Sequence, residues 1–230
     1  MKSIGLIGGL TYVSTIEYYR YINKLANEKL GGTETAEVIM YSVNFGEIKV
    51  LTEAEDWKNI SVIICKAAQT IEAGGAACLL IGANTMHKIA DEVQAVIKIP
   101  VIHIAEAVAK EILKNGLKKV GLLGTRYTTQ LGFYTDHLAK HGIETIIPGQ
   151  GDIDFLNYTI YNEFSKNLFL PGTKAAYLKI ISKLKEKGAE GIILGCTEIP
   201  FLVKQSDCDI LLFDTVKIHS AAGVDHVLSL

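Results

Sequence analysis

The second half of this sequence repeats the pattern of the first half. Residues 3–7 (SIGLI) form an apolar run that breaks at Gly8-Gly9, and residues 118–125 (KKVGLLGT) show the same run with its glycine turn. Residues 191–198 (GIILGCTE) likewise repeat residues 77–85 (ACLLIGANT) at nearly the same spacing. Short apolar runs that end in glycine are typical of buried parallel strands. The duplication therefore predicts an α/β fold with two pseudo-symmetric lobes, each a mainly parallel sheet flanked by helices.

Two similar lobes that face one another would form one active-site cleft between them, the usual place for a small ligand. We predict an N-terminal lobe of residues 1–100 plus 212–230 and a C-terminal lobe of residues 101–211. Residues 148–171 depart from the repeat and predict an inserted loop and helix. This insertion is either a lid, whose Lys166 could reach an anionic ligand, or a surface excursion.

Other segments have the patterns of regular elements. Residues 37–45 and 100–104 are typical of strands, and residues 57–72 carry apolar side chains at helical spacing. The acidic residues 53–56 indicate a solvated helix start. The strand at 100–104 has its counterpart at residues 209–214 in the second half.

Cys196 is the candidate for chemistry. It directly follows a predicted buried strand, and Pro200 predicts a helix start shortly afterwards. Open α/β sheets bind ligands at the carboxyl ends of their strands, and a helix amino end lowers the pKa of a nearby thiol. We therefore predict a reactive thiolate at Cys196. The alternative is a packed core cysteine.

Composition excludes several classes of protein. A formal net charge of −2 gives no reason to expect nucleic acid as a partner, and no apolar run is long enough to span a membrane. The N-terminus lacks a signal-peptide pattern, and the four cysteines have neither zinc-type spacing nor a disulfide framework. The glycines near residue 8 do not form a dinucleotide-binding fingerprint, and no P-loop is present. We expect a reduced, cytoplasmic protein without a bound metal.

Three motifs in order give the chain a resemblance to a known family. Residues 8–15 (GGLTYVST), 83–87 (ANTMH) and 195–198 (GCTE) together resemble the aspartate/glutamate racemases, with the closest likeness to the bacterial L-aspartate/glutamate-specific branch. Residues 42–45 (SVNF) and 123–128 (LGTRYT) add to the likeness, which runs nearly end to end.

The resemblance implies a cofactor-independent amino-acid racemase of two pseudo-symmetric lobes, with a homodimer as the expected assembly. In such an enzyme, two opposed acid/base residues remove the α-proton and return it on the other face of the α-carbon. Cys196 matches one of these two residues. The matching substrate-binding positions are Leu10, Thr52, Asn84, Thr85, Thr125, Thr128 and Thr197.

The position of the other acid/base departs from the family pattern. It should hold cysteine or threonine, but here it is Ala83, which has no transferable proton. A racemase would then need another partner, for which Thr85, His87 or a water molecule are the candidates. Two alternatives remain: a single-cysteine decarboxylase or isomerase of the same superfamily, and an amino-acid-binding protein with impaired catalysis.

Overall fold

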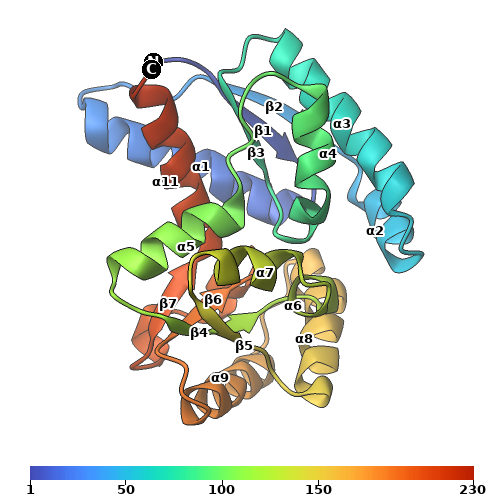
Figure 1. Ribbon diagram of the computed structural model, residues 1–230, viewed down its shortest axis with the longest axis vertical. Helices are drawn as coiled ribbons and strands as arrows, with labels where there is room; N and C mark the ends of the chain where they lie inside the picture. The colour runs from blue at the N-terminus through green and yellow to red at the C-terminus, as the bar shows by residue number, and fades with distance from the viewer. The chain divides into compact units, whose positions relative to one another are not determined.

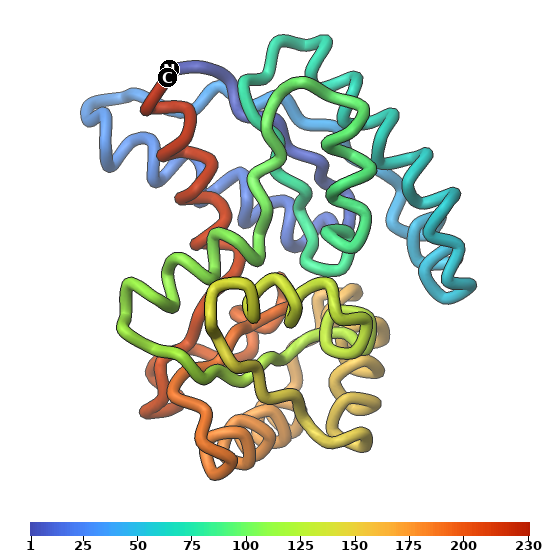
Figure 2. Tube along the Cα trace, in the orientation of Figure 1, coloured from blue at the N-terminus to red at the C-terminus, as the bar shows by residue number.

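The computed structural model describes residues 1–230, and the chain divides into two compact units. Unit 1 comprises Met1–Ile104 together with His219–Leu230, and unit 2 comprises Ala105–Ile218. Both contain a parallel sheet with flanking helices (Figure 1). The trace in Figure 2 shows that the blue amino-terminal and red carboxy-terminal segments both belong to unit 1. The predicted fold class, two lobes with parallel sheets flanked by helices, is confirmed.

Unit 1 is built on a three-stranded sheet in the order β2-β1-β3, with every pair parallel. Its strands are β1 (Ile4–Gly8), β2 (Val38–Ser42) and β3 (Cys78–Ile81). Its helices are α1 (Tyr12–Leu30), α2 (Phe45–Glu53), α3 (Trp57–Ala73), the 3-10 helix η1 (Thr85–Ile89), α4 (Ala90–Val96) and the part of α11 (Thr215–Leu228) that begins at His219. None of the chain's helices is both long enough and apolar enough to cross a membrane.

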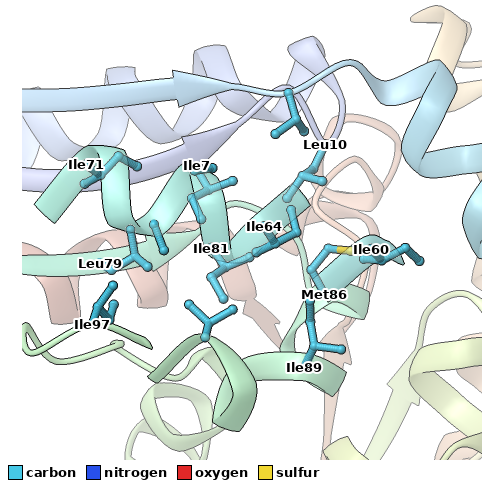
Figure 3. Packing of buried hydrophobic residues seen from close by; sticks show 14 of the residues in the cluster. Ile7, Leu10, Ile60, Ile64, Ile71, Leu79, Ile81, Met86, Ile89 and Ile97 are labelled. Atoms are coloured by element: carbon cyan, nitrogen blue, oxygen red, sulfur yellow. The ribbon is translucent and has the colours of Figure 1, made fainter. Parts of the chain in front are cut away.

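The core of unit 1 lies between the sheet and α3. Ile7, Leu79 and Ile81 project from the strands toward α3, where Ile60 and Ile64 meet them (Figure 3). The opposite face of the sheet packs against α1 and α11, since Tyr18 lies close to Gly82, and Leu80 lies close to Gly223. Both faces are thus covered, which explains why these strands are apolar runs rather than alternating ones.

Unit 2 has a four-stranded sheet in the order β5-β4-β6-β7, again with every pair parallel. Its strands are β4 (Lys119–Leu123), β5 (Glu144–Ile146), β6 (Gly191–Leu194) and β7 (Leu211–Asp214). Its helices are α5 (Ile104–Lys114, in this unit from Ala105), α6 (Arg126–Gln130), α7 (Phe133–Lys140), α8 (Gln150–Asn162), η2 (Phe164–Lys166), α9 (Pro171–Glu186), α10 (Ile199–Leu202) and η3 (Gln205–Asp207). Helices α8 and α9 pack on one face through buried apolar side chains, and α5 and α7 lie on the other (Figure 1).

The strand order confirms the internal repeat. In each unit the first strand is central, the second pairs on one side of it and the third on the other. The two sheets differ in the fourth strand, which only unit 2 has. The expected strand at residues 100–104 is reduced to a single bridge between Leu79 and Val101, and Ile104 already begins α5. Pro100 has no backbone N–H to donate, and only its carbonyl pairs, with Leu79 N at 2.9 Å.

Two predicted boundaries also differ from the structure. Strand β7 pairs with β6 and so belongs to unit 2, although residues 212–214 were expected in the N-terminal lobe. The chain returns to unit 1 only at His219, inside α11. The acidic residues 53–56 do not simply open a helix, because α2 ends at Glu53 and Asp56 caps α3 by accepting from Asn59 N.

A buried histidine ties α1 to α11 and to the segment after β3. His219 Nε2 lies 2.6 Å from the carbonyl oxygen of Ile102, and His219 Nδ1 lies 2.8 Å from the Tyr18 hydroxyl. A carbonyl only accepts, so Nε2 carries the proton and Nδ1 accepts from Tyr18. His219 is therefore neutral, and burial lowers its pKa to about 3.

This histidine makes the stability of unit 1 dependent on pH. Below pH 6.5, the ordinary pKa of histidine, His219 binds a proton in the unfolded state. In the folded state, where its pKa is about 3, it does not. The free energy of unfolding should therefore fall with decreasing pH, by about 1.4 kcal/mol per pH unit in that window. Urea unfolding at a series of pH values, for the wild type and for His219→Gln, measures this contribution.

The free energy of unfolding should depend less steeply on pH in His219→Gln than in the wild type, by roughly that amount. His226→Gln, at a partly exposed histidine on the same helix, serves as the control. Equal slopes in the wild type and His219→Gln would show that His219 takes up its proton in the folded state.

Candidate active site

Each unit has a pair of hydroxyl residues at the first helix after its central strand. In unit 1, Thr11 caps α1 by accepting from Ser14 N, and the two hydroxyl oxygens are 3.1 Å apart. In unit 2, Thr125 caps α6 by accepting from Thr128 N, and the two hydroxyl oxygens are 3.2 Å apart. All four side chains are buried. The repeat thus preserves the same capping arrangement, and it includes the predicted substrate-binding residues Thr125 and Thr128.

A glycine with little space around it precedes each candidate acid/base position. A Cβ atom on Gly195 would lie 2.6 Å from the carbonyl oxygen of Leu123, and one on Gly82 would lie 2.8 Å from that of Ile7. Both distances are too short for a side chain, so only glycine allows the strand end to lie this close to the central strand. Cys196 and Ala83 follow these two glycines and hence occupy equivalent positions in the two sheets.

The Cys196 thiol lies in a buried, acidic environment. Its Sγ donates to Glu198 Oε2 at 3.1 Å, and the Thr197 hydroxyl donates to the same oxygen at 2.8 Å. Burial raises the pKa of the Cys196 thiol well above its usual range, and the negative charge of Glu198 raises it further. The backbone N–H groups of Glu198 and Ile199 lower the pKa by less. The resting form is therefore the neutral thiol.

This result corrects the prediction of a thiolate. The helix after Cys196 is α10, which has only four residues and starts at Ile199, so its amino end supplies little stabilisation of negative charge. The sequence showed the nearby helix start, but neither the burial of the thiol nor the direction of the Glu198 carboxylate.

Glu198 is a residue that the sequence analysis did not single out. Its side chain is 3% exposed, and its Oε2 atom accepts from both Cys196 and Thr197. A buried carboxylate that accepts the thiol hydrogen bond can also take the thiol proton. The signal in the sequence was the Cys-x-Glu spacing of the GCTE motif, which places both side chains in one short turn.

The corresponding segment of unit 1 carries no such pair. Ala83 is partly buried, and Asn84 and Thr85 are buried at the start of η1. The Asn84 carbonyl accepts from His87 N at 3.1 Å, which closes the first turn of η1. Polar side chains therefore follow β3 as predicted, but the position equivalent to Cys196 has only a methyl group.

His87 is held by the backbone next to this position. Its Nδ1 lies 2.9 Å from the Ala83 carbonyl oxygen, so Nδ1 carries the proton. His87 is 3% exposed, and its ring packs edge-on against the rings of His103 and His219, with centroids 4.8 and 5.4 Å away. The structure thus places His87 beside the backbone of Ala83 and inside a cluster of three histidines.

The remaining predicted residues lie in different surroundings. Leu10 is buried just after the β1 turn, and the buried Thr52 donates its hydroxyl proton to the Ile48 carbonyl within α2, at 2.7 Å. Lys166 is exposed at the end of η2. Their roles in binding stay predictions.

Comparison with known proteins identifies relatives over the whole chain. The sequence profile of the Asp/Glu/hydantoin racemases matches residues 7–223. A crystal structure from Yersinia pestis, provisionally assigned as an Asp/Glu racemase, is 43% identical, with a TM-score of 0.91 over 99% of this chain and 100% of that one. An aspartate racemase homologue from Pyrococcus horikoshii is 36% identical, with a TM-score of 0.85 over all of both chains. The broad specificity amino-acid racemase RacX of Bacillus subtilis is 26% identical over 70% of this chain and 69% of its own.

The contact between Glu198 and Cys196 predicts the effect of removing one charge. Glu198→Gln keeps a hydrogen-bond acceptor but removes the negative charge that opposes thiolate formation, so the pKa of Cys196 should fall. Alkylation of Cys196 should then become several-fold faster near neutral pH. The measurement is the pH dependence of the alkylation rate in a chain that lacks the two partly buried cysteines, Cys65 and Cys208.

Glu163→Gln serves as the matched control, because Glu163 is bound by Thr173 rather than by the thiol. An alkylation profile unchanged by Glu198→Gln would show that the carboxylate does not govern the thiol.

Proposed function

Because the chain belongs to the Asp/Glu/hydantoin racemase family, we propose that it is a cofactor-independent amino-acid racemase acting on aspartate- or glutamate-type substrates. The observation that carries the proposal is the buried pair of Cys196 and Glu198 just after β6. The broad specificity amino-acid racemase RacX and the aspartate racemase homologue from Pyrococcus horikoshii support the choice of amino acids as substrates.

The pair suits the removal of a weakly acidic proton. The α-proton of an amino acid needs a strong base, and a thiolate whose conjugate thiol has a raised pKa is a stronger base than an ordinary one. For one enantiomer, Glu198 takes the proton from Cys196, and the thiolate then takes the α-proton, which leaves a carbanion. The pair then holds two protons, and the carbanion is protonated on its other face. For the other enantiomer the steps run in reverse: the thiol of the doubly protonated pair donates its proton to the carbanion, and Glu198 returns its proton to the thiolate.

The carbanion needs donors near the substrate carboxylate, where negative charge builds up. We assign that carboxylate to Asn84, Thr85 and Thr197, which follow the two strand-end glycines and are buried. Burial strengthens each such interaction, because water no longer competes for the charge. We also assign the hydroxyl pair of Thr125 and Thr128 to binding of the amino-acid substrate. In the proposal Thr197 has a second task, since its hydroxyl holds Glu198.

Ala83 leaves the other face of the α-carbon without a proton carrier at this position. A methyl group neither gives nor takes a proton, so inversion requires a substitute, for which we propose Thr85, His87 or a water molecule. His87 has the chemistry for the task and is bound to the Ala83 carbonyl. Ala83 also favours a second candidate function, a single-cysteine decarboxylase or isomerase, because protonation on one face needs only one acid. A third candidate is an amino-acid-binding protein with impaired catalysis.

Replacing the two equivalent residues tests the two-face mechanism. Cys196→Ser should lower racemisation of aspartate or glutamate by about 10²–10⁴-fold, because the acid/base of one face is lost. Ala83→Cys, and to a lesser degree Ala83→Thr, should raise it, because each supplies the missing proton carrier. Chiral chromatography of the products gives the rates.

Cys65→Ser is the matched control, because Cys65 lies partly buried on α3 and has no assigned role. If Ala83→Cys leaves the rate unchanged and Cys196→Ser stays active, the two-face mechanism does not apply to this protein.

A further inference from the structure

Two histidines and a glutamate converge on one point in unit 2, among residues with no assigned role in the racemase. Glu106 lies in the first turn of α5, while His137 lies on α7 and His141 follows its last residue. His137 Nε2 is 3.0 Å from Glu106 Oε2, and His141 Nε2 is 2.6 Å from the same oxygen. Helices α5 and α7 lie on the same face of the sheet of unit 2 (Figure 1).

The arrangement has the features of a metal site. One imidazole nitrogen from each histidine and one carboxylate oxygen all lie within 4.8 Å of one another. In a tetrahedral zinc site with bond lengths of about 2.0–2.2 Å, ligand atoms are roughly 3.3 Å apart, so small rotations of these side chains would suffice. Two histidines four residues apart project from one face of a helix, and the third ligand comes from a neighbouring helix.

The charges around the three residues also permit a cation. Glu106 is the acidic member of the cluster, and a nitrogen of each imidazole already lies within hydrogen-bond distance of its Oε2 atom. Lys110 is the competing cation, but its Nζ lies 3.3 Å from Oε1, the other carboxylate oxygen. All three side chains are partly exposed, at 32%, 22% and 27% for Glu106, His137 and His141, so an ion from solution can reach them.

We propose that Glu106, His137 and His141 form a binding site for a divalent transition-metal ion. Zinc is the ion that fits two imidazoles and one carboxylate best, and three protein ligands leave one coordination position for water. The ion would cross-link α5 to α7, and the proposal does not depend on the racemase activity. The sequence alone offered only the spacing of His137 and His141, because Glu106 lies on another helix.

The test is equilibrium dialysis of the untagged full chain against Zn²⁺. We expect one ion per chain, with the affinity reduced at least tenfold in His137→Gln, in His141→Gln and in Glu106→Gln. His226→Gln is the matched control and should bind as the wild type does, because His226 lies on α11 away from these ligands. No zinc bound by the wild type, or equal affinity in the His137→Gln/His141→Gln double variant, would overturn the proposal.

A second measurement on the wild type excludes the cysteines as ligands and needs no variant to fold. Co²⁺ bound by imidazole and carboxylate lacks the charge-transfer absorption that a thiolate ligand produces. We expect visible cobalt bands without that absorption, and displacement of Co²⁺ by Zn²⁺. A strong thiolate band would assign the ion to a cysteine and contradict the site.

Discussion

The close approach of each third strand to its central strand fixes where chemistry can occur in this protein. The N–H of Gly195 donates to the Leu123 carbonyl at 2.7 Å, and the N–H of Gly82 donates to that of Ile7 at 2.9 Å. These bonds continue the parallel ladders beyond the last paired residues, and the lack of a Cβ at both glycines permits them. The residue that follows each glycine is thereby held at the carboxyl ends of the strands, where open α/β sheets bind ligands.

The two repeats have kept this framework but differ at the residue that follows the glycine. Both retain the strand order, the glycine and a hydroxyl pair that caps the first helix. In unit 2 the next residue is Cys196, buried against a carboxylate, whereas unit 1 has Ala83. Burial and the charge of Glu198 both raise the pKa of the thiol, so the pair rests as a neutral thiol that donates to the carboxylate. In unit 1 the residues that follow Ala83 are polar, among them the buried His87.

The sequence predicted the fold well because its signals are local. Buried central strands are apolar runs that end in glycine, and a duplicated pattern requires a duplicated topology. The sequence predicted less where tertiary contacts decide. Residues 45–53 form α2 although they carry no strong periodicity. Residues 100–104 make only a single bridge to Leu79, although the matching residues of unit 2 form β7.

The same distinction holds for the candidate site. The strand-end positions of Cys196, Asn84 and Thr197 follow from the motifs, and the structure places all three in buried surroundings just after β6 and β3. The direction in which the pKa of Cys196 shifts could not be predicted from the motifs, because it depends on burial and on where the Glu198 carboxylate points. The cluster of Glu106 with two histidines could not be predicted from the sequence either, since its members come from two helices.

The role of Cys196 is tested most directly by α-hydrogen exchange in deuterated water, followed by NMR for L- and D-aspartate and L- and D-glutamate separately. We expect deuterium to enter at the α-carbon of at least one of these four compounds, and Cys196→Ser to abolish the exchange. Exchange accompanied by inversion would show that a second proton carrier acts besides Cys196. Absence of exchange with all four compounds, or an unchanged rate in Cys196→Ser, would contradict the assignment of Cys196 as the residue that moves the α-proton.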